Sequence, residues 1–170
     1  MARPETGTVS ELPLRVRVVT VSTRAEAGEY EDLSGPAIVK ELRQWGVPDA
    51  VVQVVADDEA TIVAALRDAV TSEVDAVLTT GGTGLAPDDR TPDATAQVIE
   101  RTVPGIAEAI RAVGREHDIP TAALSRALAG TAGRTLIVNL PGSVGGARDG
   151  MAVVGPLLAH TRDQLAGGDH

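Results

Sequence analysis

A glycine-rich loop, two aspartates and a late Pro-Gly-Ser turn are the residues of this chain whose types and spacing could do chemistry. Gly81-Gly82-Thr83-Gly84 follows a β-branched segment at residues 76–80. Glycines beyond a strand can adopt positive φ and bring backbone N–H groups against phosphate or ring oxygens. The P-loop and the dinucleotide fingerprint do not fit, because the single lysine is Lys40 and the glycine spacing differs. A tight turn explains the glycines alone about equally well.

The two acids favour a metal-assisted phosphate site. Asp57 follows the predicted strand 50–55, and Asp89 lies in the loop after the next strand. The ends of parallel strands share one sheet edge, so the carboxylates can converge there, although each alone is more often a cap or a solvated acid. A carboxylate ~5 Å from a phosphate charge costs roughly 3 kcal/mol at an effective dielectric of about 20. We therefore expect Asp57 and Asp89 to hold Mg²⁺, which prefers oxygen ligands, against a triphosphate.

Two further segments are ambiguous. Pro141-Gly142-Ser143 ends the predicted strand 135–140, so its N–H groups and the Ser143 hydroxyl could meet the same ligand. A plain turn between strand and helix explains it equally well. Ser125 is either a ligand contact or a partner for a local backbone group.

Composition limits the class of protein. The chain has 170 residues, a formal net charge of −9 and 1 % aromatic residues. Nucleic-acid binders need a basic face and often stacking aromatics, so we expect no nucleic-acid partner. No segment approaches the roughly 20 apolar residues that span a bilayer, and residues 1–13 lack a signal-peptide pattern. We therefore expect a cytoplasmic protein without membrane contact.

Strands alternating with helices predict one α/β domain with a largely parallel sheet covered on both faces. We expect a flexible arm at 1–13, a single domain at 14–166 and a frayed tail at 167–170. Ser34 should cap the first helix, a helix from Thr91 should run to about Arg101, and a final helix should carry Val153, Leu157 and Leu158. The predicted strands span residues 15–21, 50–55, 76–80 and 135–140.

The order of these motifs resembles the Mog/MoaB family of molybdenum cofactor biosynthesis proteins. Thr79-Thr-Gly-Gly-Thr-Gly84, the acid at Asp89 and Thr91-Pro92-Asp93-Ala94-Thr95 resemble the family signature. Weaker matches are Ser34-Gly35-Pro36, Val55-Ala56-Asp57 with Ala56 replacing the usual proline, Leu124-Ser125-Arg126 and Asn139-Leu-Pro-Gly142.

The resemblance implies a three-layer α/β/α sandwich with a mixed, mostly parallel sheet, and a homotrimer. It also implies Mg²⁺-dependent transfer of AMP from ATP to the terminal phosphate of molybdopterin, with Asp57 and Asp89 as catalytic and metal-binding residues. Asp88 is a rival for the metal role that spacing disfavours. The implied substrate-binding residues are Ser22, Ser34, Gly81, Gly82, Thr83, Gly84, Ser125, Pro141, Gly142 and Ser143.

Other functions stay open at this point. A MoaB-type protein could bind or carry molybdopterin without catalysis, and a related domain of competence-damage proteins acts on nucleotides. Retention of both acids favours the enzyme, because pterin binding alone does not obviously require them. A molybdenum-insertion protein is a candidate partner.

Overall fold

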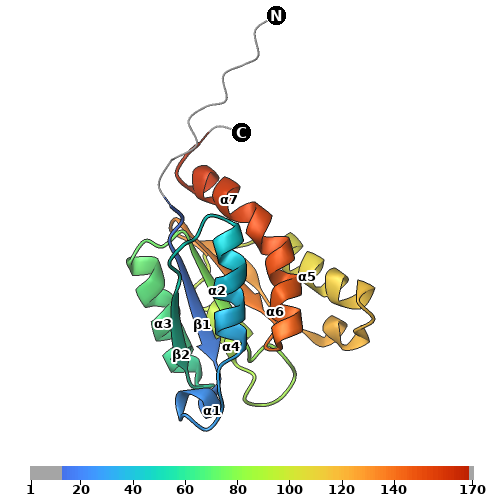
Figure 1. Cartoon of the computed structure of the whole chain (residues 1–170). Coiled ribbons are helices and arrows are strands. Elements are labelled where there is room, and N and C mark those ends of the chain that lie inside the picture. Colours follow the sequence, from blue (N-terminus) through green and yellow to red (C-terminus); the bar gives the residue numbers. More distant parts are fainter. Residues whose placement is uncertain (1–12, 169–170) are drawn as a thin grey trace, which may run out of the picture.

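A mixed six-stranded sheet in the order β2-β1-β3-β6-β5-β4 forms the centre of the computed structural model, which describes residues 13–168 (Figure 1). β1, β2, β3 and β6 are mutually parallel where they pair, whereas β5 and β4 join antiparallel. The strands are β1 Val16–Val21, β2 Val51–Val55, β3 Ala76–Thr80, β4 Arg101–Thr102, β5 Ala129–Ala132 and β6 Thr135–Leu140.

Helices cover both faces of this sheet, which confirms the expected sandwich. α2 (Ser34–Gln44), α5 (Pro104–Glu116) and α6 (Val144–Val154) lie on one face, and α3 (Glu59–Thr71) and α4 (Thr91–Ala96) on the other. Strand side chains alternate between the faces. Val18, Leu78 and Val138 lie in register and pack under α2, α5 and α6, whereas Val19, Val77 and Ile137 pack under α3 and α4. The core is aliphatic, as the composition requires.

The helix predicted from Thr91 to about Arg101 is shorter, because its C-terminal part joins the sheet. α4 ends at Ala96, the Glu100 N–H donates to Thr131 O over 2.8 Å, and β4 pairs with β5. Sequence patterns did not predict β5, since Ala-Gly-Thr-Ala carries little β propensity. All four residues of β5 are nevertheless buried, so tertiary packing decides this part of the sheet.

The helix termini also differ from the prediction. Ser34 is the first residue of α2 rather than its cap, and the N-cap position is Leu33, whose side chain makes no capping bond. The carboxylate of Asp32, one residue earlier, accepts from the Gly35 N–H at 3.0 Å. The expected final helix is divided into α6, a 3-10 turn η2 (Gly155–Leu157) and α7 (Leu158–Leu165), since Pro156 has no N–H to continue the α-helical ladder.

The two ends of the chain lie mostly outside the described residues. Of the predicted arm at 1–13, only Pro13 is described, and it is exposed. Of the predicted tail at 167–170, Gly167 and Gly168 are described, and their N–H groups donate to Gln164 O and Asp163 O at the end of α7.

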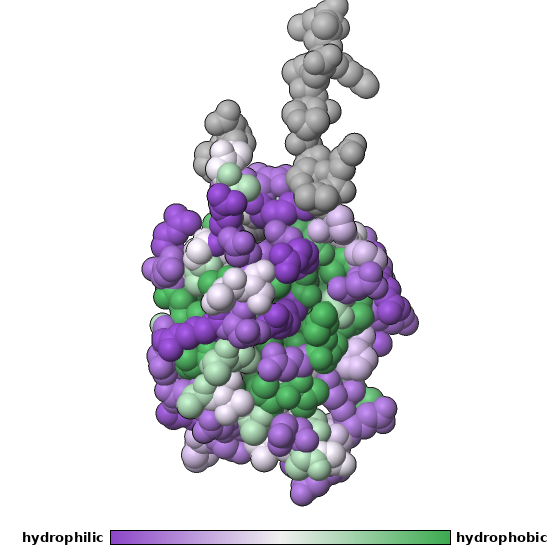
Figure 2. Space-filling model, turned by 90° about the vertical axis from the view of Figure 1, so that its left-hand side faces the viewer, coloured by the Kyte–Doolittle hydropathy of each residue, from purple (hydrophilic) through white to green (hydrophobic). Residues whose placement is uncertain are grey.

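The strand β2 lies at one edge of the sheet and is partly open. Val51 in this strand is 63 % exposed, and Figure 2 shows apolar side chains between polar ones on the side where β2 and α3 lie in Figure 1. None of the helices within residues 13–168 combines the length and the hydropathy of a membrane span.

Candidate functional site

The site is built at the edge of the sheet where β1, β3 and β6 end. Thr20, Thr80 and Leu140 lie in register, so the glycine loop and the Pro-Gly-Ser turn emerge side by side. Gly81 has φ +94°, and a Cβ there would lie 2.5 Å from Val21 O. Only glycine allows this backbone approach. A Cβ on Gly142 would likewise lie 3.1 Å from Gly81 Cα, so the three chain segments are in close contact.

A pocket of about 430 Å³ opens beside β1, and we call it the β1 pocket. It lies between β1 and β3, where the chain order of the sheet reverses, a usual ligand position in open α/β sheets. Asp32 lines it and is held by the Thr20 hydroxyl at 2.8 Å. Its lining residues are Thr20, Val21, Ser22, Ala25, Tyr30, Asp32, Leu33, Ser34, Thr80, Gly81, Gly142, Ser143 and Val144.

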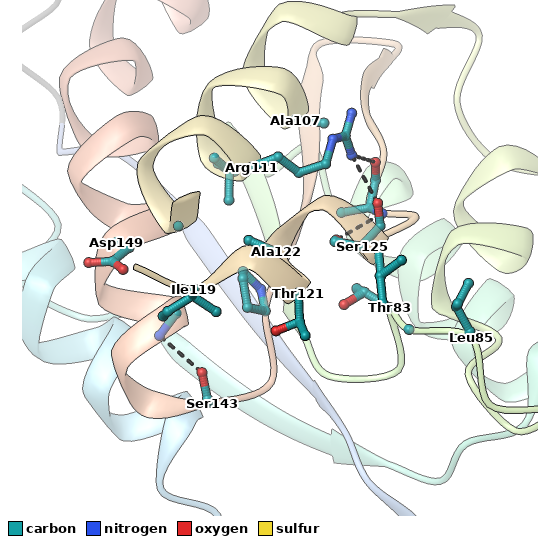
Figure 3. Close-up of a pocket in the computed structure, with 17 residues that line it drawn as sticks. Thr83, Leu85, Ala107, Arg111, Ile119, Thr121, Ala122, Ser125, Ser143 and Asp149 are labelled. Atoms are coloured by element: carbon teal, nitrogen blue, oxygen red, sulfur yellow. Dashed lines mark hydrogen bonds between the residues drawn. The ribbon is translucent and has the colours of Figure 1, made fainter. Parts of the chain in front are cut away.

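A second pocket of about 400 Å³ lies on the other side of the loop and turn, and we call it the α5 pocket. Figure 3 shows its labelled side chains, with Arg111 reaching from α5 to the backbone near Ser125. Its walls are mostly apolar, which suits the faces of a flat ring system. Its lining includes Thr83, Gly84, Leu85, Ala107, Ile110, Arg111, Gly114, Ile119, Thr121, Ala122, Leu124, Ser125, Ala127, Pro141, Ser143, Gly146 and Asp149.

The predicted substrate-binding residues divide between these two pockets. Ser143 lines both pockets, and of the predicted set only Gly82 lines neither. Thr83, Gly84, Ser125 and Pro141 line the α5 pocket; Ser22, Ser34, Gly81 and Gly142 line the β1 pocket. The hydroxyls of Ser22 and Ser143 also cap α1 (Thr23–Glu26) and α6, respectively. Capping and ligand contact are therefore not exclusive roles for these two serines.

Asp57 is fixed against the start of α1. Its Oδ2 accepts from the Thr23 N–H at 2.7 Å and from the Thr23 hydroxyl at 3.0 Å, while its own N–H donates to Thr23 Oγ1 at 2.9 Å. These bonds position Asp57 although Ala56 precedes it. Its other oxygen, Oδ1, lies 3.5 Å from the point that a Cβ on Gly82 would occupy.

Asp89 lies beside the other end of the glycine loop. A Cβ on Gly84 would come 2.7 Å from Asp89 Oδ2, and the same oxygen accepts from the Ala86 N–H at 3.0 Å. Asp88 is exposed, and among the described residues the only side chain that a Cβ on Gly84 would meet within 4 Å is that of Asp89. The carboxylates of Asp57 and Asp89 thus flank one short stretch, Gly82 to Gly84.

These two acids have the donors that Mg²⁺ prefers. Each keeps one oxygen, Oδ1, without a hydrogen-bond partner among the described residues. No cluster of three or more His, Cys, Asp or Glu side chains suited to a metal occurs in residues 13–168. Mg²⁺ at phosphate-handling sites commonly takes one or two carboxylates and completes its shell with substrate phosphate and water. The residues present therefore fit Mg²⁺ bound together with a ligand.

The neighbouring acid Asp58 has a structural role. It caps α3, accepting from the Thr61 hydroxyl at 2.6 Å and the Thr61 N–H at 2.9 Å. These bonds from the Thr61 side chain and backbone lower the pKa of Asp58 below its ordinary value.

Sequence reasoning missed most of the α5 pocket. The sequence patterns did not indicate that Ile110 of α5 or the segment Pro120–Leu124 (η1) would line a pocket. Asp149 and Arg126 were also missed. Arg126 binds the backbone of the loop that carries Asp89, and only its place after Ser125 in a family-like motif could have drawn attention to it.

The fold and the two pockets at the carboxyl edge of the sheet place this protein in the class of doubly wound α/β ligand-binding domains. A family model described as "Probable molybdopterin binding domain" matches residues 17–160, and the chain belongs to this family. The Mog/MoaB resemblance of the sequence is thereby confirmed.

Relatives extend over most of the chain. The molybdopterin adenylyltransferase of Helicobacter pylori is 36 % identical over 157 residues, 91 % of this chain and 89 % of the relative. The molybdenum cofactor biosynthesis bifunctional protein of Synechococcus elongatus is 41 % identical over 153 residues, 90 % of this chain. The chain spans only 48 % of that relative's length. The solved molybdopterin biosynthesis Mog protein from Mycobacterium ulcerans is 43 % identical with a TM-score of 0.85, covering 92 % of this chain and 99 % of its own.

Proposed function

We propose that this protein transfers AMP from ATP to the terminal phosphate of molybdopterin, with release of pyrophosphate. The observation that carries the proposal is the pair of pockets, which share Ser143 and lie on either side of the glycine loop. Asp57 and Asp89 flank Gly82 and Gly84 of this loop, and neither acid itself lines a pocket. A transfer between two substrates needs both held with their reacting groups in contact. The relatives named for this activity support the same reaction.

We assign the pterin to the α5 pocket and the nucleotide to the β1 pocket. The apolar walls formed by Ile110, Ala122 and Leu124 suit the flat pterin ring. The β1 pocket has more polar side chains, including Ser22, Asp32 and Ser34, which suit the hydroxyls and base of a nucleotide. This division brings the phosphates of both ligands to the glycine loop.

The start of α6 lies where the two pockets meet. Ser143 lines both pockets, Val144 lines the β1 pocket and Gly146 the α5 pocket. The first N–H groups of a helix have no partner within it and attract anions. The α6 terminus is therefore placed to hold the phosphate that is shared between donor and acceptor.

The reaction forms a bond between a terminal phosphate oxygen of molybdopterin and the α-phosphorus of ATP. It breaks the bond between that phosphorus and the oxygen that bridges to the β-phosphorus, and this oxygen leaves with pyrophosphate. Asp57 and Asp89 would hold Mg²⁺, which neutralises the charge of the phosphates when bound. The protein otherwise acts by positioning, since phosphoryl chemistry of this kind needs little covalent help. Thr23 keeps Asp57 in place through both its hydroxyl and its N–H.

Adenylation by the purified protein tests the proposal directly. Molybdopterin, ATP and Mg²⁺ are supplied, and adenylated product and pyrophosphate are measured together. Asp57→Asn and Asp89→Asn should each lower turnover roughly 10²–10³-fold, as the loss of transition-state charge stabilisation does elsewhere, with molybdopterin binding retained. Asp88→Asn is the matched control and should keep wild-type turnover. Tight molybdopterin binding without product would instead identify a carrier.

Assembly and location belong to the same proposal. We expect a homotrimer in the cytoplasm that passes its product to a molybdenum-insertion protein, because the sequence resembles a family with these properties. Light scattering of the purified protein tests the trimer.

A further inference from the structure

The loop that carries Asp89 has few contacts of its own. Leu85, Ala86 and Asp88 are exposed, and the loop belongs to no helix or strand. Two bonds close it internally: the Asp89 N–H donates to Ala86 O, and the Ala86 N–H donates to Asp89 Oδ2, both at 3.0 Å. A segment with so little burial opens readily unless other groups hold it.

One side chain from a distant segment supplies that hold. The Arg126 Nε donates to Gly84 O at 2.8 Å, and its Nη2 donates to Asp89 O at 2.5 Å. One planar guanidinium therefore bridges both ends of the loop, from Gly84 to Asp89. The Arg126 N–H also donates to Thr83 O at 2.9 Å, so the backbone and the side chain of Arg126 both bind the glycine loop that follows β3.

An ion pair completes the arrangement. Both terminal nitrogens of Arg126 lie near Asp93 Oδ2, at 3.2 and 3.3 Å. Asp93 is in the first turn of α4, so Arg126 connects the loop to that helix. Both side chains are 37 % exposed, so water screens the pair. The position of the loop therefore depends mainly on the bonds from Arg126 to Gly84 O and Asp89 O.

We infer that Arg126 is a positioning residue for Asp89, fixing the carboxylate against the glycine loop by tying Gly84 O to Asp89 O. The inference rests on the proposed function in so far as Asp89 binds the metal. Lysine cannot replace this role, because a single ammonium group lacks the fork that reaches two carbonyls and a carboxylate together. Arg126 itself need not touch either substrate.

Two measurements on the purified full-length chain test this role. Hydrogen exchange, read by mass spectrometry, should accelerate in Arg126→Ala and Arg126→Lys within residues 84–93 and stay unchanged in α2 and α3. Mn²⁺ binding in the presence of ATP, read by electron paramagnetic resonance, should weaken about 10–100-fold in Arg126→Ala, the usual effect of losing a group that orients a metal ligand. Arg126→Lys, the variant more certain to fold, should weaken it in the same direction.

Asp93→Asn is the matched control, since it removes the ion pair and leaves the two carbonyl bonds. Its Mn²⁺ affinity should stay within about fivefold of wild type. A full loss in Asp93→Asn would overturn the role assigned to the carbonyl bonds. Wild-type protein that binds no Mn²⁺ with ATP would overturn the proposed function. Wild-type binding that both Arg126 variants leave unchanged, or exchange that accelerates throughout the chain, would overturn the positioning role alone.

Discussion

Replacing Gly81 with alanine tests the geometry on which both pockets depend. Gly81 has φ +94°, and its new Cβ would lie 2.5 Å from Val21 O, a backbone atom in the central strand β1. Left-handed backbone costs alanine roughly 1–2 kcal/mol, and overpacking adds about 1–3 kcal/mol. We expect Gly81→Ala to lose about 2–5 kcal/mol of unfolding free energy.

Gly28→Ala separates the two contributions. Gly28 has φ +75°, but nothing lies within 4 Å of a Cβ there. This control therefore bears only the conformational cost, roughly 1–2 kcal/mol. Urea unfolding followed by circular dichroism measures both variants, and adenylation is assayed in parallel. Gly81→Ala should lose activity because β1 and the glycine loop must separate, whereas Gly28→Ala should not.

Equal destabilisation of the two alanine variants would refute this reasoning. The close contact between Gly81 and Val21 would then contribute nothing, and the loop would have room to move. Full activity in a destabilised Gly81→Ala would refute the functional part, since the two pockets would not depend on this contact.

Four further substitutions test the site and its support. Ala122→Leu should raise the KM for molybdopterin alone and Ala25→Leu the KM for ATP alone, because each fills a different pocket; steady-state kinetics showing the reverse pattern would exchange the pocket assignments. Asn139→Ala should lower the free energy of unfolding by about 1–3 kcal/mol, because the half-buried Leu128 N–H loses its acceptor and the buried hydroxyls of Thr79 and Thr95 lose their donor; urea curves matching wild type would contradict this. Asp58→Ala should be less stable than wild type at neutral pH, because the ionised carboxylate of Asp58 caps α3. The folded-state pKa of Asp58 is lowered, so the full stabilisation is present above its ordinary pKa of 3.8 and is lost as pH falls through the lowered pKa. Thermal melts at several pH values should therefore show the difference between the two proteins disappear in acid.

Local sequence patterns determined much of the fold and of the site. Strands β1, β2, β3 and β6 are rich in β-branched and other aliphatic residues, so their alternation with helices predicts the parallel part of the sheet. Because parallel strands end at one edge, that pattern also predicted that Asp57 and Asp89 would lie near the glycine loop. The structure puts both carboxylates beside Gly82 and Gly84. The strands could be predicted because each pattern involves residues close together in the chain, and the position of the acids could be predicted because it follows from the common edge at which parallel strands end.

Only the tertiary structure decided the rest. The strand β5 has weak intrinsic propensity and forms because β6 and β4 pair with it. The division into two pockets depends on how α5 and η1 pack beside the turn at Ser143. The bonds from Arg126 to Gly84 and Asp89 join residues 42 and 37 positions apart. Contacts at such separations leave no periodic signal in the sequence, because the sheet rather than the local chain brings the partners together.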